Sequence, residues 1–118
     1  KIVCFASIAA VNGMSNGTDY AAAKGAIISF TRSLAIEMAP YGVYVNCVTP
    51  SGVATERIQT FMPSTVGGTG QNERGTMSNL ATPEEIAAAT LFLVSDDSNH
   101  VSGQNIIFGV PPAPRPPR

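Results

Sequence analysis

The sequence predicts an α/β protein with a doubly wound parallel sheet, and two observations support this. Three short apolar runs, at 2–6, 43–48 and 104–108, have the length and composition of strands buried on both faces of such a sheet. Two longer runs between them, at 18–38 and 82–94, are rich in residues that favour helices. Strands that alternate with helices are typical of crossover connections, in which neighbouring strands run in the same direction.

The long helix at 18–38 follows a loop of small residues at 7–17. Thr18 or Asp19 is expected to cap its amino end, and Pro40 and Gly42 to end it. One stripe along it contains Tyr20, Lys24, Ile27, Thr31, Leu34 and Met38. Its other sides carry Ala22, Ala26, Phe30, Ser33 and Ala35. Because most of this circumference is small or apolar, we expect the helix to be buried on more than one side.

The second helix has a clear start signal in Thr82-Pro83-Glu84-Glu85. A threonine cap, a proline at the first helical position and a glutamate at the third are typical of a capping box. The residues expected on its buried face are Ile86, Thr90, Leu91, Leu93 and Val94.

Two segments lie outside this pattern of strands and helices. Residues 57–79 are polar and rich in Gly, Ser and Thr, which suits a mobile lid over a substrate, with disorder of no gating role as the alternative. Residues 109–118 contain five of the nine prolines and predict an irregular tail of polyproline II type. The domain itself is therefore expected to cover residues 1–108.

Composition narrows the classes of partner and compartment. The net charge of −1 and the absence of a basic run argue against nucleic acid as a partner. No apolar stretch is long enough to cross a membrane. Cys4 and Cys47 fall in strand-like runs and are expected to be buried free thiols, which suits a reducing, cytoplasmic compartment. They lack histidine or cysteine partners at ligand spacing, so we expect no metal site.

A possible catalytic set begins with Tyr20 and Lys24, which are four residues apart on the long helix. Residues at this spacing are neighbours on a helix, about 5–6 Å apart at Cβ. An ammonium held there favours the ionised form of the tyrosine, which can then exchange a proton with a ketone or an alcohol. Ser7 lies thirteen residues before the tyrosine, and its hydroxyl can hold a substrate oxygen while its charge changes. Ser7, Tyr20 and Lys24 could each be explained as structural residues, but their spacing taken together favours a catalytic role.

These residues, followed by the runs 45–50 (Val-Asn-Cys-Val-Thr-Pro) and 52–55 (Gly-Val-Ala-Thr), give the chain a family resemblance. It resembles the carboxyl-terminal half of a short-chain dehydrogenase/reductase, a family with a Rossmann-type NAD(P)-binding fold. The resemblance runs from Lys1 to about Phe108. The amino-acid sequence of residues 1–7 and 46–55 is most similar to plant members that oxidise alcohols of terpenoids, lignans and hormone precursors.

The resemblance implies a reaction and the roles of three catalytic residues. The reaction would be hydride transfer between a small-molecule alcohol or ketone and NAD or NADP. Tyr20 would be the acid/base, and Ser7 would orient the substrate oxygen. Lys24 would favour the ionised tyrosine and hold the ribose hydroxyls of the cofactor, beside which Tyr20 also lies.

The resemblance also implies cofactor contacts in the turn after the second strand. Val53, through its backbone, and Thr55 would contact the nicotinamide carboxamide, while Pro50 shapes the turn. The family normally has glycine directly after this proline, whereas this chain has Ser51 followed by Gly52. The position of Thr55 is therefore less firmly implied than that of Val53.

A nucleotide-binding α/β fold needs a glycine-rich turn after its first strand, and no such turn follows an apolar strand here. We therefore expect the amino-terminal half of the fold to be missing and the isolated chain to be inactive. The full-length form would be a homodimer or homotetramer, because the long helix packs against a partner subunit in the family. The alternative is a truncated, non-catalytic protein that acts through dimerisation or another protein interaction.

Overall fold

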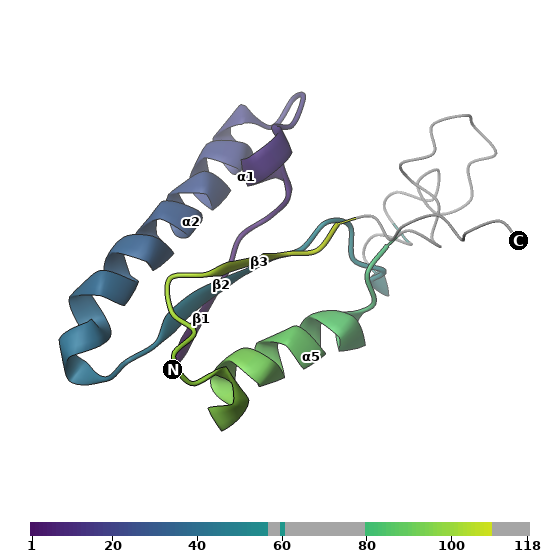
Figure 1. The fold of residues 1–118 in the computed structure, drawn as a ribbon. Coiled ribbons are helices and arrows are strands. Elements are labelled where there is room, and N and C mark those ends of the chain that lie inside the picture. The colour runs from purple at the N-terminus through teal and green to yellow at the C-terminus, as the bar shows by residue number, and fades with distance from the viewer. Residues whose placement is uncertain (57–59, 61–79, 110–118) are drawn as a thin grey trace, which may run out of the picture.

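The computed structural model describes residues 1–56, 60 and 80–109, which form three layers. Figure 1 shows α2 on one face of a small sheet and α5 on the other. The elements are β1 (Ile2–Phe5), α1 (Ala9–Asn12), α2 (Thr18–Met38), a 3-10 helix (Ala39–Tyr41), β2 (Val45–Thr49), α5 (Pro83–Val94), a second 3-10 helix (Asp96–Ser98) and β3 (Asn105–Ile107). The predicted α/β architecture with alternating strands and helices is confirmed.

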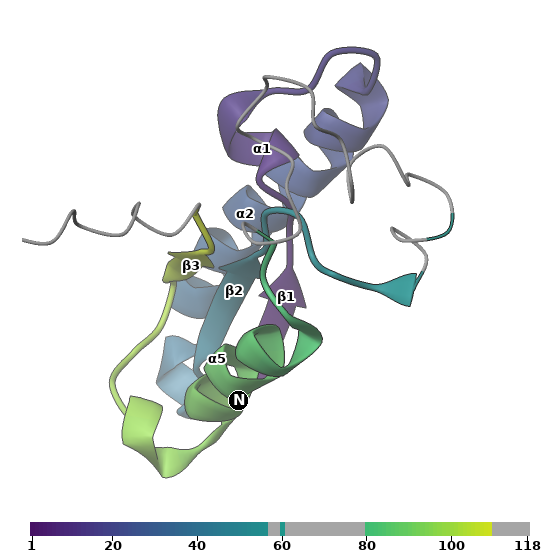
Figure 2. The same cartoon turned by 90° about the vertical axis from the view of Figure 1, so that its right-hand side faces the viewer.

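The three strands are parallel and lie in the order β1-β2-β3. Cys4 pairs with Cys47 between the first two strands, and Cys47 pairs with Asn105 between the last two. Because the strands advance in one direction while α2 and α5 cover opposite faces, the two crossovers have opposite hands (Figures 1 and 2). The carboxyl ends of all three strands meet at one edge of the sheet.

The centre of the core is β2, whose five residues are all buried. β1 differs from the prediction of a strand buried on both faces, because Ile2 and Phe5 are 40% and 43% exposed. The physical reason is its position: among the described residues, no strand pairs with the outer edge of β1. The prediction was wrong for this strand and right for β2.

The long helix α2 begins and packs differently from the prediction. Its N-cap is Gly17, and neither Thr18 nor Asp19 caps it, because both already lie in the first helical turn. The buried residues are Ile28, Thr31 and Ala35, so Ala35 belongs to the face packed on the sheet. The opposite side is open, as Phe30 is 55% exposed. The predicted loop at 7–17 also contains the short helix α1.

Helix α5 begins as its sequence predicts. The Thr82 hydroxyl accepts a hydrogen bond from the Glu85 N–H (3.1 Å), and the Glu85 carboxylate accepts one from the Thr82 N–H (2.8 Å). Leu93 is fully buried, but Leu91 and Val94, which were expected to be buried, are exposed. These two side chains line a shallow groove with Phe5 beyond the outer edge of β1, where the described residues offer nothing to cover them.

Most of the predicted lid at 57–79 and all but Gly109 of the proline-rich tail lie outside the described residues. In the described part of the chain, no helix has the length and apolar character needed to cross a membrane. The same residues contain no cluster of side chains able to hold a metal ion.

Candidate active site

The candidate active site lies where the carboxyl ends of β1 and β2 meet. The Ala6 N–H donates a hydrogen bond to the Val48 carbonyl, and the Ile8 N–H donates one to the Pro50 carbonyl, both at 2.9 Å. Parallel pairing thus continues past the end of β1. It holds the turn that carries Ser7 against the turn that begins at Pro50.

Ser7 leaves β1 two residues after its last strand position and is half-buried. Its Oγ accepts a hydrogen bond from the Ala9 N–H at 3.3 Å, which fixes the side chain at the start of α1. Within residues 1–56, 60 and 80–109, no acceptor takes the hydroxyl hydrogen of Ser7. This hydrogen is therefore free to be donated to a substrate oxygen.

Tyr20 and Lys24 lie on the first two turns of α2, as the helical spacing predicts. The Lys24 Nζ is 5.9 Å from the centroid of the Tyr20 ring and donates a hydrogen bond to the Phe5 carbonyl at 3.2 Å. The Tyr20 side chain is 47% exposed. No hydrogen bond joins Ser7 to Tyr20 in the described part of the chain.

The sequence did not predict a role for the Phe5 carbonyl. It is the last carbonyl of β1, two residues before Ser7, and it anchors the ammonium of Lys24. A lysine on a helix that passes over the end of a strand could have indicated a hydrogen bond to a carbonyl of that strand. The Lys24 ammonium therefore lies near both the Tyr20 ring and the end of the strand that leads to Ser7.

The turn after β2 is tied to the segment before α5. Val53 and Ala81 form a parallel bridge, in which the Ala54 N–H donates to the Ala81 carbonyl and the Ala81 N–H to the Gly52 carbonyl, both at 2.9 Å. The Val53 carbonyl accepts from the Thr55 N–H at 2.8 Å, while no described residue accepts the Val53 N–H. Among the described residues, this backbone donor therefore has no acceptor, and it lies at the end of the sheet where ligands bind.

Two neighbours of this turn explain its shape. A Cβ built on Gly52 would lie 2.3 Å from Leu80 Cδ2, so a side chain at this position would displace Leu80. The Ser51 Oγ is buried and has no hydrogen-bond partner among the residues that the structure describes. The sequence identified Ser51 as a departure from the family pattern, but only the structure shows that its hydroxyl is unsatisfied.

The groups at this edge fit a nicotinamide dinucleotide. The Lys24 ammonium and the Val53 N–H are donors, and the ribose hydroxyls and carboxamide oxygen of such a cofactor accept hydrogen bonds. The site is also at the edge where parallel α/β sheets bind their ligands.

Comparisons with known proteins agree with this arrangement. Residues 1–109 match the family model described as Enoyl-(Acyl carrier protein) reductase. The chain is 38% identical to the NAD-dependent glycerol dehydrogenase of Listeria innocua, over 92% of this chain and 42% of that protein. It is 35% identical to the xanthoxin dehydrogenase of Arabidopsis thaliana, over 92% of this chain and 41% of that protein.

A solved structure gives the same result for the fold. The 3-ketoacyl-(acyl-carrier-protein) reductase of Brucella melitensis, complexed with NADH, matches with a TM-score of 0.72 and 28% identity, covering 90% of this chain and 41% of that one. The chain thus spans about two-fifths of the length of these relatives. A bacterial relative and a plant relative match about equally well, so membership of a plant subgroup stays a prediction. The 118-residue chain belongs to the short-chain dehydrogenase/reductase family.

Proposed function

We propose that this chain carries the Ser7-Tyr20-Lys24 set of an NAD(P)-dependent oxidoreductase that acts on an alcohol or ketone. The observation that carries the proposal is the position of the Lys24 ammonium, between the Tyr20 ring and the Phe5 carbonyl. That position joins the helix that bears the tyrosine to the strand that leads into the serine.

The residues divide the proton chemistry between them. In the oxidative direction, ionised Tyr20 takes the hydroxyl proton of the alcohol while a hydride leaves the adjacent carbon, and a ketone is formed. Ser7 donates its free hydroxyl hydrogen to the substrate oxygen and holds it near the tyrosine. Lys24 places its positive charge beside the tyrosine, 5.9 Å from the ring centroid. A nicotinamide cofactor, when bound, would supply the acceptor of the hydride in this direction and its donor in the other.

For the cofactor, we propose NAD or NADP held by backbone and side-chain donors. Lys24 holds the ribose hydroxyls, the Val53 N–H holds the carboxamide, and Pro50 fixes the turn between them through the Ile8 hydrogen bond. Thr55 would add a side-chain contact. The names of two matched proteins support a nicotinamide dinucleotide, since one is NAD-dependent and the other is complexed with NADH.

For the substrate, we propose a small secondary alcohol or its ketone, of the terpenoid, lignan or hormone-precursor type. The match to xanthoxin dehydrogenase supports this narrower class of substrate. The match to glycerol dehydrogenase supports glycerol as the competing candidate substrate. Both can be offered as substrates in one assay.

We further propose that the protein assembles as a homodimer or homotetramer in the cytoplasm. The outer side of α2 supports assembly, because Phe30 and its neighbours there are exposed and apolar or small. The two free thiols of Cys4 and Cys47 support a reducing compartment.

The test is a Tyr20→Phe variant of the natural protein at its full length, assayed for alcohol-dependent formation of NADH or NADPH. Loss of a general acid/base lowers turnover by about 10²–10⁴-fold. We expect NADH binding, followed by fluorescence titration, to stay within about twofold, because the other cofactor contacts remain. Tyr41→Phe is the matched control, since Tyr41 is an exposed tyrosine at the far end of α2. Near-normal turnover in Tyr20→Phe would remove the tyrosine from the mechanism.

A second candidate function is a non-catalytic interaction protein that pairs through α2. The exposed Phe30 on the outer side of this helix favours it. The intact mass of the protein from its native source separates the two candidates: a mass near twice that of this chain supports the dehydrogenase, and a mass equal to this chain supports the interaction protein.

A further inference from the structure

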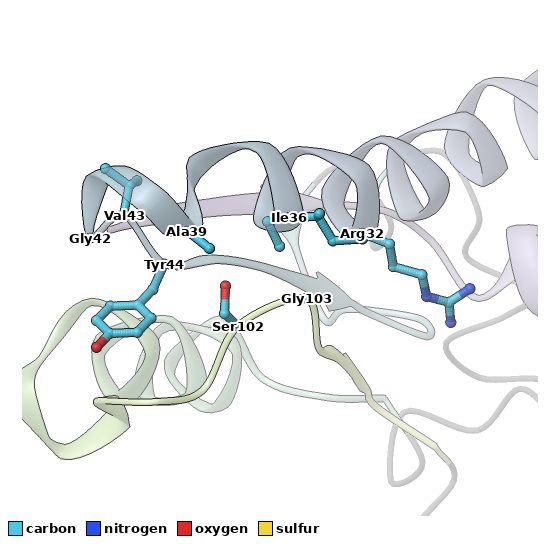
Figure 3. A pocket seen from close by; sticks show the side chains of 9 residues that line it. Arg32, Ile36, Ala39, Gly42, Val43, Tyr44, Ser102 and Gly103 are labelled. Atoms are coloured by element: carbon cyan, nitrogen blue, oxygen red, sulfur yellow. The ribbon is translucent and has the colours of Figure 1, made fainter.

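A second cavity lies at the end of the sheet opposite to the candidate active site. It has a volume of about 530 Å³ and lies between the last turns of α2 and the segments that lead into β2 and β3 (Figure 3). This volume is within the range of pockets that hold small organic ligands, about 300–1,000 Å³. None of its lining residues belongs to the Ser7-Tyr20-Lys24 set.

The wall of the cavity is one side of α2. Arg32, Ile36 and Ala39 follow one another at spacings of four and three residues, so they share this side, and Phe30 does not. Figure 3 shows the Arg32 guanidinium at one end and the Tyr44 ring at the other. Between these ends the exposed surface of the cavity is mostly apolar.

The floor of the cavity is rigid because it is tied to the buried central strand. The Ser102 Oγ accepts a hydrogen bond from the Val45 N–H at 3.2 Å, and the Gly103 N–H donates one to the Val45 carbonyl at 2.7 Å. Gly103 has a φ of 71°, a conformation that favours glycine and lets the floor pass close beneath Ala35. The cavity is therefore formed before any ligand binds.

The polar groups of the cavity are donors. Arg32 is the only charged residue among those that line it, and no carboxylate of the described residues forms an ion pair with it. The Ser102 hydroxyl points toward α2 (Figure 3), and its hydrogen has no acceptor within the described part of the chain. A guanidinium at one end of an apolar wall selects a ligand with an anionic head and an apolar body.

We propose that this cavity binds a small amphipathic carboxylate. The carboxylate pairs with Arg32, and the apolar chain lies along Ile36 and Ala39 toward Tyr44. The distance from Arg32 to Ala39 along the helix axis is about 10 Å, which a medium-length alkyl chain can span. The orientation is fixed, because the carboxyl end of α2, near Ala39, is the negative end of the helix dipole and repels an anionic head. This site is independent of the proposed oxidoreductase reaction.

The test uses octanoate as the probe and the natural protein at its full length. We expect a saturable binding isotherm in titration calorimetry, unchanged by saturating NADH because the two sites are at opposite ends of the sheet. Arg32→Gln should weaken octanoate binding at least about tenfold, since a hydrogen-bonded charge pair is lost. Ala39→Phe should also weaken it, because the larger side chain fills the path of the alkyl chain. The neutral analogue 1-octanol should bind wild type as weakly as octanoate binds Arg32→Gln.

Several results would overturn the proposal. Octanoate affinity that Arg32→Gln leaves unchanged would show that the guanidinium is not the carboxylate site. Displacement of octanoate by NADH would place it in the active site instead. Absence of binding, together with a change of oligomeric state in Ala39→Phe by analytical ultracentrifugation, would make this surface an interface between copies. Arg32 is exposed, so its substitution is compatible with folding even if Ala39→Phe is not.

Discussion

The buried polar side chains Asn46 and Ser51, at opposite ends of the three-stranded sheet, differ in their hydrogen bonds. At the amino end, the buried Asn46 side chain donates to the Val101 carbonyl (2.8 Å) and accepts from the Gln104 N–H (3.1 Å). The Lys1 ammonium likewise bonds the Ser98 hydroxyl at 3.0 Å. At the carboxyl end, the Ser51 hydroxyl is buried without a partner, and the Val53 N–H finds no acceptor among the described residues.

This difference separates groups that hold the chain from groups that are left for a ligand. Buried polar groups in proteins are nearly always hydrogen-bonded, so unsatisfied ones need an explanation. Paired groups at the amino end stabilise the fold by closing the loop 99–104 against β2. Unpaired groups at the carboxyl end lie in the turn where parallel α/β sheets bind ligands. The comparison therefore predicts which substitutions affect activity and which affect stability.

The largest expected effect is on activity, from Lys24→Met in the natural protein at its full length. Turnover should fall by about 100-fold or more, and NADH binding should weaken by about tenfold, because one charged donor serves both the tyrosine and the ribose. The free energy of unfolding should change by less than about 1 kcal/mol, since the lysine is partly exposed. Steady-state kinetics, fluorescence titration and urea unfolding measure the three quantities.

Glu37→Met is the control for Lys24→Met, because it also removes an exposed charge from α2 but lies far from the site. It should leave turnover within about twofold. A Lys24→Met protein that loses stability but keeps its turnover would break the comparison, since the lysine would then belong with the structural groups.

The next largest effect is on stability, from Asn46→Ala. The substitution leaves the Val101 carbonyl and the Gln104 N–H unpaired beside the core, and the expected loss is about 3 kcal/mol of unfolding free energy. Urea unfolding followed by circular dichroism measures it. Asn12→Ala, at an exposed position, should change the same quantity by less than about 0.5 kcal/mol. Equal effects from the two substitutions would mean that the Asn46 hydrogen bonds do not hold the amino end.

A smaller effect is expected from Thr82→Ala, which removes the cap of α5. The loss should be about 1 kcal/mol of unfolding free energy. Thr18→Ala is the matched control, because Thr18 begins α2 without capping it, and a change of only a few tenths of a kcal/mol is expected. A larger loss of unfolding free energy from Thr18→Ala than from Thr82→Ala would mean that Thr18, and not Thr82, caps its helix.

The parts of the fold and site that sequence predicted follow from local spacing. A four-residue separation on a helix is enough to place Tyr20 beside Lys24. The start of α5 was also predicted, because its capping box is complete within four residues. None of these required knowledge of distant residues.

The predictions that were wrong or missing concern contacts between a residue and an element distant in the sequence. Leu91, Val94 and Phe5 were expected to be buried because they are apolar, but burial requires a neighbouring element that their local pattern does not specify. The buried hydrogen bonds of Asn46 were missed for the same reason, since their partners are more than fifty residues away. The predicted capping residue of α2 was wrong because Gly17, Thr18 and Asp19 are all acceptable at a helix start.

The smallest expected effect gives the sharpest test of the comparison between the two ends. Ser51→Ala removes a buried hydroxyl that has no partner, so the unfolding free energy should stay the same or rise by up to about 1 kcal/mol. Ser102→Ala removes a hydroxyl that accepts from the Val45 N–H, so it should cost about 1 kcal/mol. Both are serine-to-alanine substitutions next to a strand end, and urea unfolding of the two variants compares them directly. A loss in Ser51→Ala as large as that in Ser102→Ala would mean that the Ser51 hydroxyl stabilises the fold and that the two ends of the sheet do not differ in this respect.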